Sequence, residues 1–300
     1  MSEPIIIDAH HHVWNLAVRD QEWITGPDLA PLRRSFGLED LRPQAERAAV
    51  TATVVVQTVT VAEETPELLA QAASDPLVAG VVGWTDLTAA DVAERLAQLR
   101  EMPGGEHLVG VRHQVQGEPD PDWLLRPEVL RGLAAVADAG LVYDLLVLPH
   151  QLPAATAAAR RLPGLAFVLD HAGKPAVAVA ELRPWASHVR TLAAEPNVSC
   201  KLSGLLTEAD WERWSIEDLR PFADTVLDAF GPGRVMFGSD WPVCTLAADY
   251  ATVVSTTRRL IARLDTHEQA LVLAGTAGDV YRLRPPPRST PRIPAQARRP

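Results

Sequence analysis

Three consecutive histidines near the N-terminus, His10, His11 and His12, are the side chains of this sequence best suited to chemistry. They follow an apolar, β-branched segment at residues 5–9, which predicts a strand. Side chains alternate between the two faces of a strand, so His10 and His12 would point to one side and His11 to the other. Two imidazoles on one side of a strand end can bind one divalent cation. We therefore expect His10 and His12 to be metal ligands and His11 to be structural.

Eight short apolar segments are spread along the chain, and most are continuously apolar, which is typical of strands buried on both faces. They lie at residues 5–9, 53–59, 78–84, 108–113, 141–147, 165–170, 198–202 and 234–237. The stretches between and after them are rich in Ala, Leu, Glu and Arg and predict helices. These helices are expected at residues 38–49, 63–74, 89–101, 127–139, 153–161, 178–194, 216–230, 245–264 and 266–283.

Strands that alternate with helices predict parallel βα units, and eight such units close a (β/α)8 TIM barrel of the α/β class. An open doubly wound sheet would more often have about five to seven strands, and for a dinucleotide it would need a glycine-rich first turn. The first turn here is rich in histidine instead. We expect residues 1–284 to form one barrel domain and the Pro- and Arg-rich residues 285–300 to be a disordered tail.

Composition narrows the class of protein further. The 300 residues are 47% hydrophobic and carry a formal net charge of −10, which does not suggest a nucleic-acid partner. There are two cysteines and no C-x-x-C motif, which fits a reduced, cytoplasmic setting. The N-terminus does not read as a signal peptide, and the apolar runs are too short for a membrane span. The sequence leaves open whether the protein is a homo-oligomer.

In a barrel, the C-terminal ends of the strands surround the active site, so polar and aromatic residues at the ends of the eight segments are the candidates for function. The catalytic candidates are Asp240, Arg112, His113 and Lys201. The candidates for metal binding are His10, His12, His171 and Asp240, and those for substrate binding are Trp14, Trp84, Gln114, Asp144 and Trp241.

These residue types suit a metal-assisted hydrolysis. Neutral imidazoles and one carboxylate can hold a zinc-like ion that lowers the pKa of a bound water. A carboxylate such as Asp240 can take the proton of the water and later give it to the leaving oxygen. A neighbouring Arg112 or Lys201 can hold the substrate or stabilise developing negative charge.

Structural roles compete with catalytic ones at several of these positions. His171 could only bond a backbone carbonyl, and Asp240 could cap a helix or form a turn. Lys201 could pair with a buried acid. Asp144 lies in an apolar segment and needs a partner if it is buried, for which an ion pair with Arg112 is one solution. The tryptophans at strand ends could equally belong to the core.

Five motifs together make the chain resemble the amidohydrolase superfamily. They are DAHHHVW at residues 8–14, GVRH at 110–113, LDHAGKP at 169–175, KLSG at 201–204 and FGSDWP at 237–242. In this order they are similar to the sugar-lactonase branch, with enzymes of the L-fuconolactonase and L-rhamnonolactonase type, and the resemblance spans residues 4 to about 284.

The resemblance implies a metal-dependent-hydrolase type of TIM barrel that hydrolyses the ester of a small lactone, such as a sugar aldonolactone. It assigns the metal to His10, His12 and His171, the general base to Asp240, and contacts with the substrate or its carbonyl to Arg112, His113 and Lys201. The fourth-strand lysine and the fifth-strand histidine of binuclear members are missing, which favours one divalent metal, zinc by this ligand chemistry, or none.

Two other hypotheses remain. The same fold could carry a metal-dependent non-oxidative decarboxylase of an aromatic or muconate-type acid. A degenerate barrel could also bind a ligand without turnover, although the complete set of polar strand-end residues speaks against this. The lactone itself is not identified, because loops decide specificity. Arg33 and Arg34 in the long loop at residues 15–37 keep a dicarboxylate lactone open.

Overall fold

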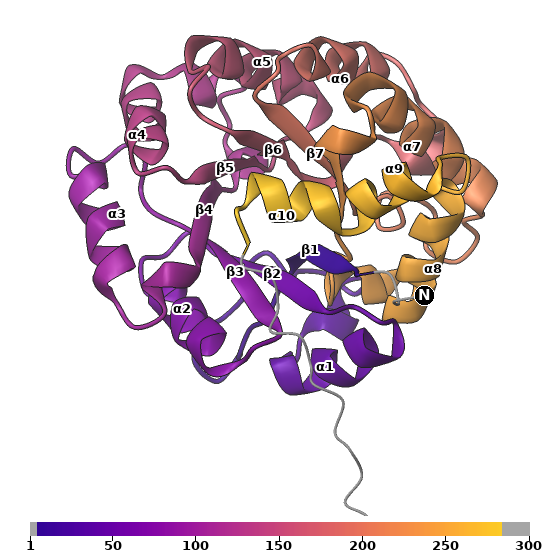
Figure 1. Cartoon of the computed structure of the whole chain (residues 1–300), viewed down its shortest axis with the longest axis horizontal. Helices are drawn as coiled ribbons and strands as arrows, with labels where there is room; N and C mark the ends of the chain where they lie inside the picture. Colours follow the sequence, from indigo (N-terminus) through magenta and orange to yellow (C-terminus); the bar gives the residue numbers. More distant parts are fainter. Residues whose placement is uncertain (1–4, 284–300) are drawn as a thin grey trace, which may run out of the picture.

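The computed structural model describes residues 5–283, which contain an eight-stranded parallel sheet in the order β1 to β8 (Figure 1). The strands are β1 Ile7–His11, β2 Ala52–Val56, β3 Val78–Gly83, β4 Leu108–His113, β5 Val142–Leu145, β6 Phe167–Leu169, β7 Val198–Leu202 and β8 Val235–Phe237. Each strand pairs with the next in parallel, so the predicted (β/α)8 barrel is confirmed.

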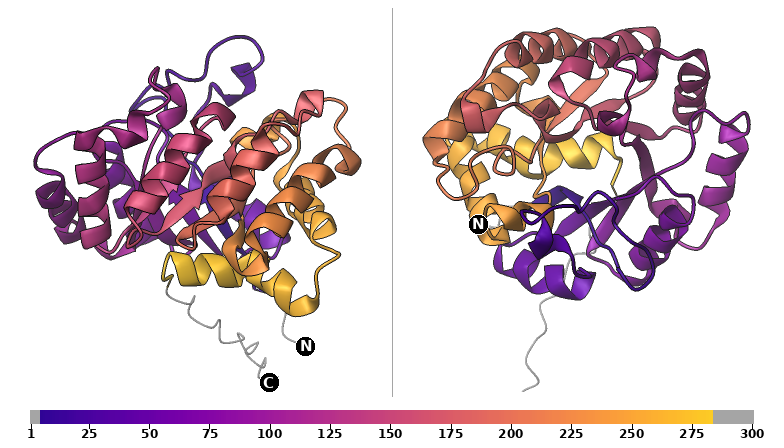
Figure 2. Two further views of the ribbon diagram at one scale, coloured as in Figure 1. Left: turned by 90° about the horizontal axis from the view of Figure 1, so that it is seen from above. Right: turned by 180° about the vertical axis from the view of Figure 1, so that it is seen from behind.

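Helices surround the sheet on its outside, and Figure 2 shows the same arrangement from the side and from behind. They are α1 Leu38–Arg47, α2 Glu64–Ser74, α3 Val92–Glu101, α4 Pro127–Asp138, α5 Leu152–Arg161, α6 Trp185–Ala193, α7 Ile216–Phe230, α8 Tyr250–Leu260, α9 Thr266–Ala270 and α10 Thr276–Val280. None of the helices within residues 5–283 is both long and apolar enough to cross a membrane.

Local side-chain chemistry moves some boundaries away from those expected from the sequence. The helix expected at residues 245–264 begins at Tyr250, because the Asp249 side chain accepts a hydrogen bond from Thr252 N and caps the first turn. The helix expected at residues 178–194 begins only at Trp185. The tail expected at residues 285–300 lies outside the described residues.

The barrel closes through backbone hydrogen bonds between β1 and the segment that follows β8. Asp240 N donates to His10 O at 2.8 Å, and His12 N donates to Trp241 O at 2.6 Å. Asp8 reinforces this joint, because its carboxylate accepts hydrogen bonds from the Ser239 backbone N at 2.7 Å and from the Ser239 hydroxyl at 2.6 Å. Closure therefore brings the histidine segment and Asp240 together.

A β-bulge in β1 decides which way its histidines point. Asp8 pairs with Thr53, whereas the next paired residues are His11 and Val55, so three steps along β1 match only two along β2. The extra residue turns the His10 side chain into the barrel, where it contacts Lys201. His11 stays on the other face, where its Nε2 lies 3.0 Å from Thr53 Oγ1.

Side chains on the inner faces of the strands pack against the C-terminal helix α10, which crosses one end of the barrel (Figure 1). Tyr281, directly after α10, reaches into the barrel, and its hydroxyl donates to Asp144 with both carboxylate oxygens at 2.8 Å. Burial, followed by the nearby Asp144 carboxylate, raises the pKa of Tyr281, so the phenol stays protonated as a donor. The hydrogen bond ties the last helix to the interior of the barrel.

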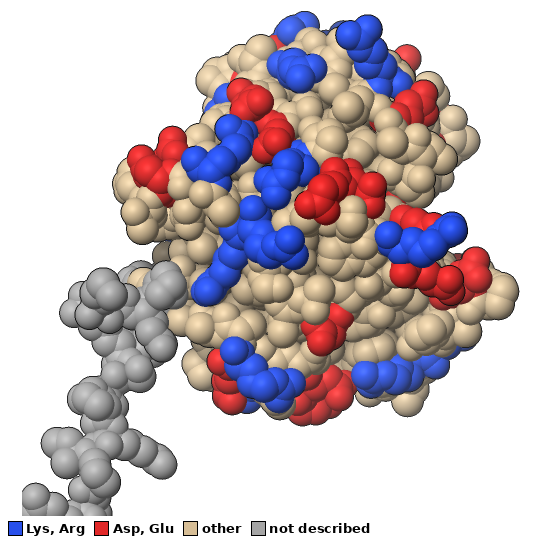
Figure 3. Space-filling model, turned by 90° about the vertical axis from the view of Figure 1, so that its right-hand side faces the viewer, with Lys and Arg blue, Asp and Glu red and all other residues tan. Residues whose placement is uncertain are grey.

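On the side of the molecule shown in Figure 3, basic and acidic side chains lie next to one another. Ion pairs between surface elements include Arg263 Nε with Asp224 Oδ1 at 3.0 Å. Such exposed pairs contribute little to stability because water and salt screen them. The stability of the barrel therefore depends on its buried contacts.

We predict that Tyr281→Phe destabilises the protein by about 1–3 kcal/mol, because Asp144 loses a buried hydrogen-bond donor. Urea unfolding followed by circular dichroism measures the change. Tyr143→Phe is the matched control, since Tyr143 is also buried but its hydroxyl makes no hydrogen bond to the described residues. Equal losses in the two variants would contradict the role of the Tyr281 hydroxyl.

Candidate active site

Four side chains converge at the C-terminal ends of β1, β6 and β8. His10 Nε2 lies 3.2 Å from His12 Nε2. Asp240 Oδ1 lies 3.5 Å from His12 Nε2 and 3.9 Å from both His10 Nε2 and His171 Nε2. The structure therefore brings together all four residues that the sequence nominated as metal ligands.

Contacts behind the imidazoles hold them in place. His12 Nδ1 lies 2.8 Å from Val56 O, and a carbonyl can only accept, so Nδ1 carries the proton and Nε2 is free to bind a cation. His171 Nδ1 lies 2.9 Å from Ser203 Oγ. These second contacts orient both Nε2 atoms toward Asp240.

Glycines leave the space that two of these histidines need. A Cβ on Gly238, directly after β8, would lie 2.8 Å from His10 Cβ. A Cβ on Gly204, after β7, would lie 2.8 Å from His171 Cβ, and Gly204 also has a φ of +69°. The small residues in the GSD and LSG motifs therefore serve the packing of the histidines.

A layer of buried charges lies beneath the histidines. Arg112 Nη1 donates to Asp170 Oδ2 at 3.0 Å. Lys201 Nζ lies 2.5 Å from Asp144 Oδ2, 2.9 Å from Asp170 Oδ1 and 3.1 Å from His10 Nδ1. The buried partner of Asp144 is therefore Lys201 and not Arg112. The layer neutralises itself because it contains two cations and two carboxylates.

Burial and neighbouring groups set the protonation of the site. Burial alone would raise the pKa of Asp240, but the imidazoles of His171 and His12 hold it below its usual range. Burial lowers the pKa of His171 to about 4 and the pKa of His10 well below its usual value. At neutral pH the site thus combines an ionised Asp240 carboxylate with neutral imidazoles at His10 and His171.

The geometry of this cluster fits one zinc-like ion. A tetrahedral ion with bonds of about 2.0–2.2 Å keeps its donors roughly 3.3–3.6 Å apart. The separations of Asp240 Oδ1 from the three imidazoles and of His10 Nε2 from His12 Nε2 run from 3.2 to 3.9 Å. His10, His12 and Asp240 form one candidate metal-binding group, and His10, Asp170 and His171 form another. The second is less suitable, because Arg112 and Lys201 already hold both Asp170 oxygens.

The cluster faces a cavity of about 130 Å³, which is small compared with the pockets that bind drug-sized molecules. It is lined by His12, Trp23, Thr58, Arg112, Gln114, Gln116, Leu146, His171, Lys174, Asp240 and Val243. The wall contains both polar and apolar side chains. Such a space suits one small ring with several hydroxyl groups.

Several residues nominated from the sequence do not line this cavity. His113 lies behind the wall, where it contacts Glu118 Oε1 at 2.8 Å, and Trp84 Nε1 donates to His113 Nδ1 at 3.1 Å. Trp241 is buried in the core against Phe36. Each of these side chains has a partner outside the pocket, so the strand-end position alone did not bring it to the substrate.

Two charged candidates and one tryptophan are also displaced from the pocket. Lys201 and Asp144 are fully buried beneath His10, where Lys201 Nζ contacts His10 Nδ1 and Asp144 pairs with Lys201. Trp14 donates from Nε1 to Arg34 O and lines a different cavity. Among the nominated residues outside the metal cluster, Arg112 and Gln114 do line the catalytic pocket.

The sequence reasoning missed six residues of the pocket wall, which are Trp23, Thr58, Gln116, Leu146, Lys174 and Val243. Trp23 comes from the long loop after β1, Gln116 from the loop after β4 and Lys174 from the loop after β6. A signal for Lys174 was present in the HAGKP motif directly after His171. Trp23 and Gln116 carry no such signal, because only the folded loops bring them to the strand ends.

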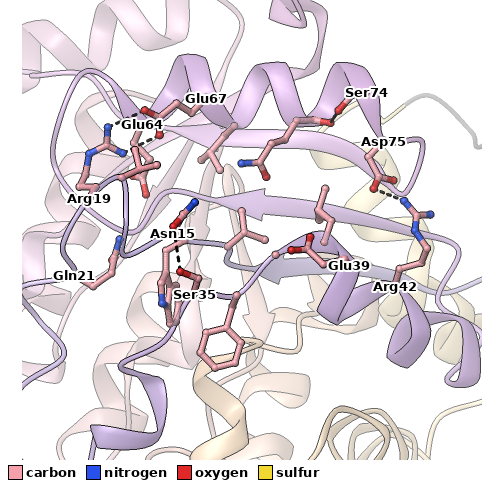
Figure 4. A pocket seen from close by; sticks show the side chains of 18 residues that line it. Asn15, Arg19, Gln21, Ser35, Glu39, Arg42, Glu64, Glu67, Ser74 and Asp75 are labelled. Carbon is pink, nitrogen blue, oxygen red and sulfur yellow. Dashed lines mark hydrogen bonds and ion pairs between the residues drawn. The ribbon is translucent and has the colours of Figure 1, made fainter.

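A second cavity, larger than the one beside the histidines, is separate from this cluster. It measures about 730 Å³ and lies between α1, α2 and the first loop, as Figure 4 shows. Arg19 pairs there with Glu67 at 3.0 Å, and Arg42 pairs with Asp75. None of its lining residues is a histidine or a cysteine, so size alone does not mark the catalytic pocket.

Comparison with known proteins identifies the family. The family model for amidohydrolases matches residues 7–283. The chain belongs to the amidohydrolase family. The amidohydrolase is 42% identical over 291 residues to a Burkholderia multivorans protein named L-fucono-1,5-lactonase, covering 93% of this chain and 97% of the relative. It also matches a crystal structure of a Burkholderia multivorans amidohydrolase with bound zinc, at 41% identity and a TM-score of 0.88, covering 93% of this chain and 100% of that one.

The decarboxylase alternative receives much weaker support. A crystal structure of 5-carboxyvanillate decarboxylase from Sphingomonas paucimobilis matches the amidohydrolase at 16% identity and a TM-score of 0.65, covering 94% of this chain and 100% of that one. A likeness at that identity shows the shared fold alone.

We predict that Gly238→Ala lowers kcat by about a hundredfold, because the new methyl group displaces His10 from the cluster. Steady-state kinetics and the thermal midpoint measure activity and folding separately. Gly233→Ala is the matched control, since nothing lies within 4 Å of a Cβ at that position. A Gly238→Ala variant with wild-type kcat would contradict the steric role of Gly238.

Proposed function

We propose that this amidohydrolase is a sugar lactonase that opens the ring of a small aldonolactone with water activated by Asp240. The observation that carries this proposal is the Asp240 carboxylate, with its pKa held below the usual range, beside three imidazoles at the floor of a small polar pocket. The lactonase name of a relative that matches 93% of the chain supports the same reaction. The partner of the protein is accordingly a small-molecule substrate.

Asp240 acts as the general base. Its Oδ1 faces the imidazoles, and the carboxylate takes a proton from the attacking water while the new C–O bond forms at the lactone carbonyl. The bond from the carbonyl carbon to the ring oxygen then breaks, and the proton passes to that leaving oxygen. The product is a hydroxy acid, which ionises to its carboxylate at neutral pH.

Arg112 lies against the reacting centre with part of its hydrogen-bonding capacity free. Its Nε donates to Gln57 Oε1 at 2.9 Å, its Nη2 to Gln57 O and its Nη1 to Asp170. These bonds engage three of the five N–H groups of a guanidinium. Nη1 also lies 3.3 Å from His10 Nε2, at the edge of the pocket. The remaining N–H groups are placed to stabilise negative charge on the lactone carbonyl oxygen.

The same cluster would hold one zinc ion through His10, His12, His171 and Asp240. When bound, zinc would supply Lewis-acid polarisation and lower the pKa of a coordinated water. The Asp170 carboxylate, 3.3 Å from His10 Nδ1, is then the partner that orients this ligand. The buried layer beneath the cluster thus has the same purpose in either form, which is to keep His10 in place.

We predict that Asp240→Asn lowers kcat for lactone hydrolysis by about 10²- to 10⁴-fold, because the amide cannot accept the proton of water. A panel of aldonolactones in weak buffer with a pH indicator measures the acid released, after subtraction of spontaneous hydrolysis. Equal rates for the wild type and the variant on every active lactone would contradict the role of Asp240. Release of carbon dioxide without acid formation would favour a decarboxylase.

We predict that the purified protein, after equilibration with zinc and gel filtration, retains about one zinc ion per chain by elemental analysis. His171→Ala removes one of four donors, and we expect it to lower zinc affinity at least tenfold. His267→Ala, at an exposed position on α9, is the matched control and should bind zinc as the wild type does. Unchanged affinity in His171→Ala would contradict the assigned site.

A further inference from the structure

Lys174 is the most accessible cation in the wall of the catalytic pocket, and its ammonium group forms an ion pair with a carboxylate. Its Nζ donates to Glu208 Oε1 at 3.0 Å. About a quarter of each side chain is exposed. Lys174 belongs to the pocket lining, whereas Glu208 stands behind it on the loop after β7. The pair therefore presents a neutralised ammonium group to the substrate.

The backbone places Lys174 at this wall at a conformational cost. His171, Ala172 and Lys174 all have positive φ values of 52–53°, and Gly173 between them has a φ of 71°. The left-handed conformation strains the three residues that carry a Cβ, which are His171, Ala172 and Lys174, whereas Gly173 adopts it freely. Such strain persists where the surrounding structure holds the backbone in place. Lys174 N donates to His171 O at 2.8 Å, which holds the turn closed.

The other cation of the pocket, Arg112, lies at the reacting centre, and most of its N–H groups are already bonded. Arg112 is 3% exposed and binds Asp170 and Gln57. Arg33 and Arg34 of the first loop do not line the pocket. Arg33 pairs with Asp20 at 2.9 Å, and Arg34 pairs with Asp40 at 3.5 Å. Within residues 5–283, each cation of the pocket lining thus has a carboxylate partner.

This balance has consequences for a charged ligand. On the Lys174 side of the pocket, the carboxylate of a charged lactone would meet a cation that is already paired with the Glu208 carboxylate. Like charges brought together in a confined site repel and reject a wrong partner. The hydroxy-acid anion formed by hydrolysis meets the same surroundings, so the pocket favours its release.

We propose that Glu208, by neutralising Lys174, restricts the catalytic pocket to uncharged lactones and promotes release of the carboxylate product. The proposal rests on the lactonase function and adds to it the charge class of the substrate and the residue pair that selects it. Lys174 contacts the substrate, and Glu208 acts on the substrate through Lys174.

The test compares hydrolysis of an uncharged aldonolactone with hydrolysis of an aldarolactone, which carries a free carboxylate, by wild type and Glu208→Gln. The amide keeps a hydrogen-bond acceptor for Lys174 but removes the negative charge. We expect the ratio of kcat/KM for the charged lactone over the uncharged one to rise about tenfold, and inhibition by the aldonate product to strengthen several-fold. The double variant Glu208→Gln, Lys174→Met should return both quantities toward the wild-type values.

Glu67→Gln is the matched control, because it removes the acid of the Arg19 ion pair, which also spans 3.0 Å but lies outside the catalytic pocket. It should leave the ratio unchanged. A folded Glu208→Gln variant with the wild-type ratio of kcat/KM for the charged over the uncharged lactone would overturn the proposal. An increase in this ratio that persists in the double variant without Lys174 would overturn it too.

Calorimetry of aldonate and aldarate binding distinguishes a failure of this proposal from a failure of the lactonase function. Tighter anion binding by Glu208→Gln than by wild type supports the charge filter even if no lactone of the panel is hydrolysed, a result that would count against the lactonase function alone. Unchanged anion affinity would overturn the charge filter even in a fully active lactonase.

Discussion

The joint between β1 and the segment after β8 is the interaction on which the rest of this structure depends. The backbone of His10 accepts from Asp240 N, and His12 N donates to Trp241 O, so the bonds that close the barrel also set the catalytic residues side by side. The Asp8 carboxylate reinforces the joint from outside the barrel through Ser239. Closure of the fold and assembly of the site are thus one event.

Beneath this joint, charge balance explains why so polar an interior is tolerated. Arg112 and Lys201 share Asp170, and Asp144 completes the layer with a hydrogen bond from Tyr281. Isolated buried charges would be strongly destabilising, whereas paired and hydrogen-bonded ones are not. The layer contacts His10 through Lys201, and it links the C-terminal helix at one end of the barrel to the histidine cluster at the other.

In the pocket above the cluster the cations are also paired with carboxylates, but the pairing there has a different effect. In the buried layer the pairing supports the histidines, whereas at the pocket wall the Lys174 and Glu208 pair controls which ligands find an available cation. The reaction turns an uncharged ring into an anion, so a wall whose exposed cation, Lys174, is already paired with Glu208 distinguishes substrate from product. Catalysis and release are then served by one electrostatic arrangement.

The sequence by itself determined the fold class, the family and the four residues of the cluster, because strand periodicity, strand count and motifs such as the histidine triplet are local properties of the chain. It also indicated correctly that His10 and His12 share a side. Only the tertiary structure decided that this side faces the barrel, through one extra residue in β1. It also decided that Lys201 is buried and that His113 and the strand-end tryptophans do not line the catalytic pocket. Trp23, Gln116 and Lys174 belong to the wall of this pocket for the same reason. These outcomes depend on partners distant in the sequence, and no local pattern encodes such contacts.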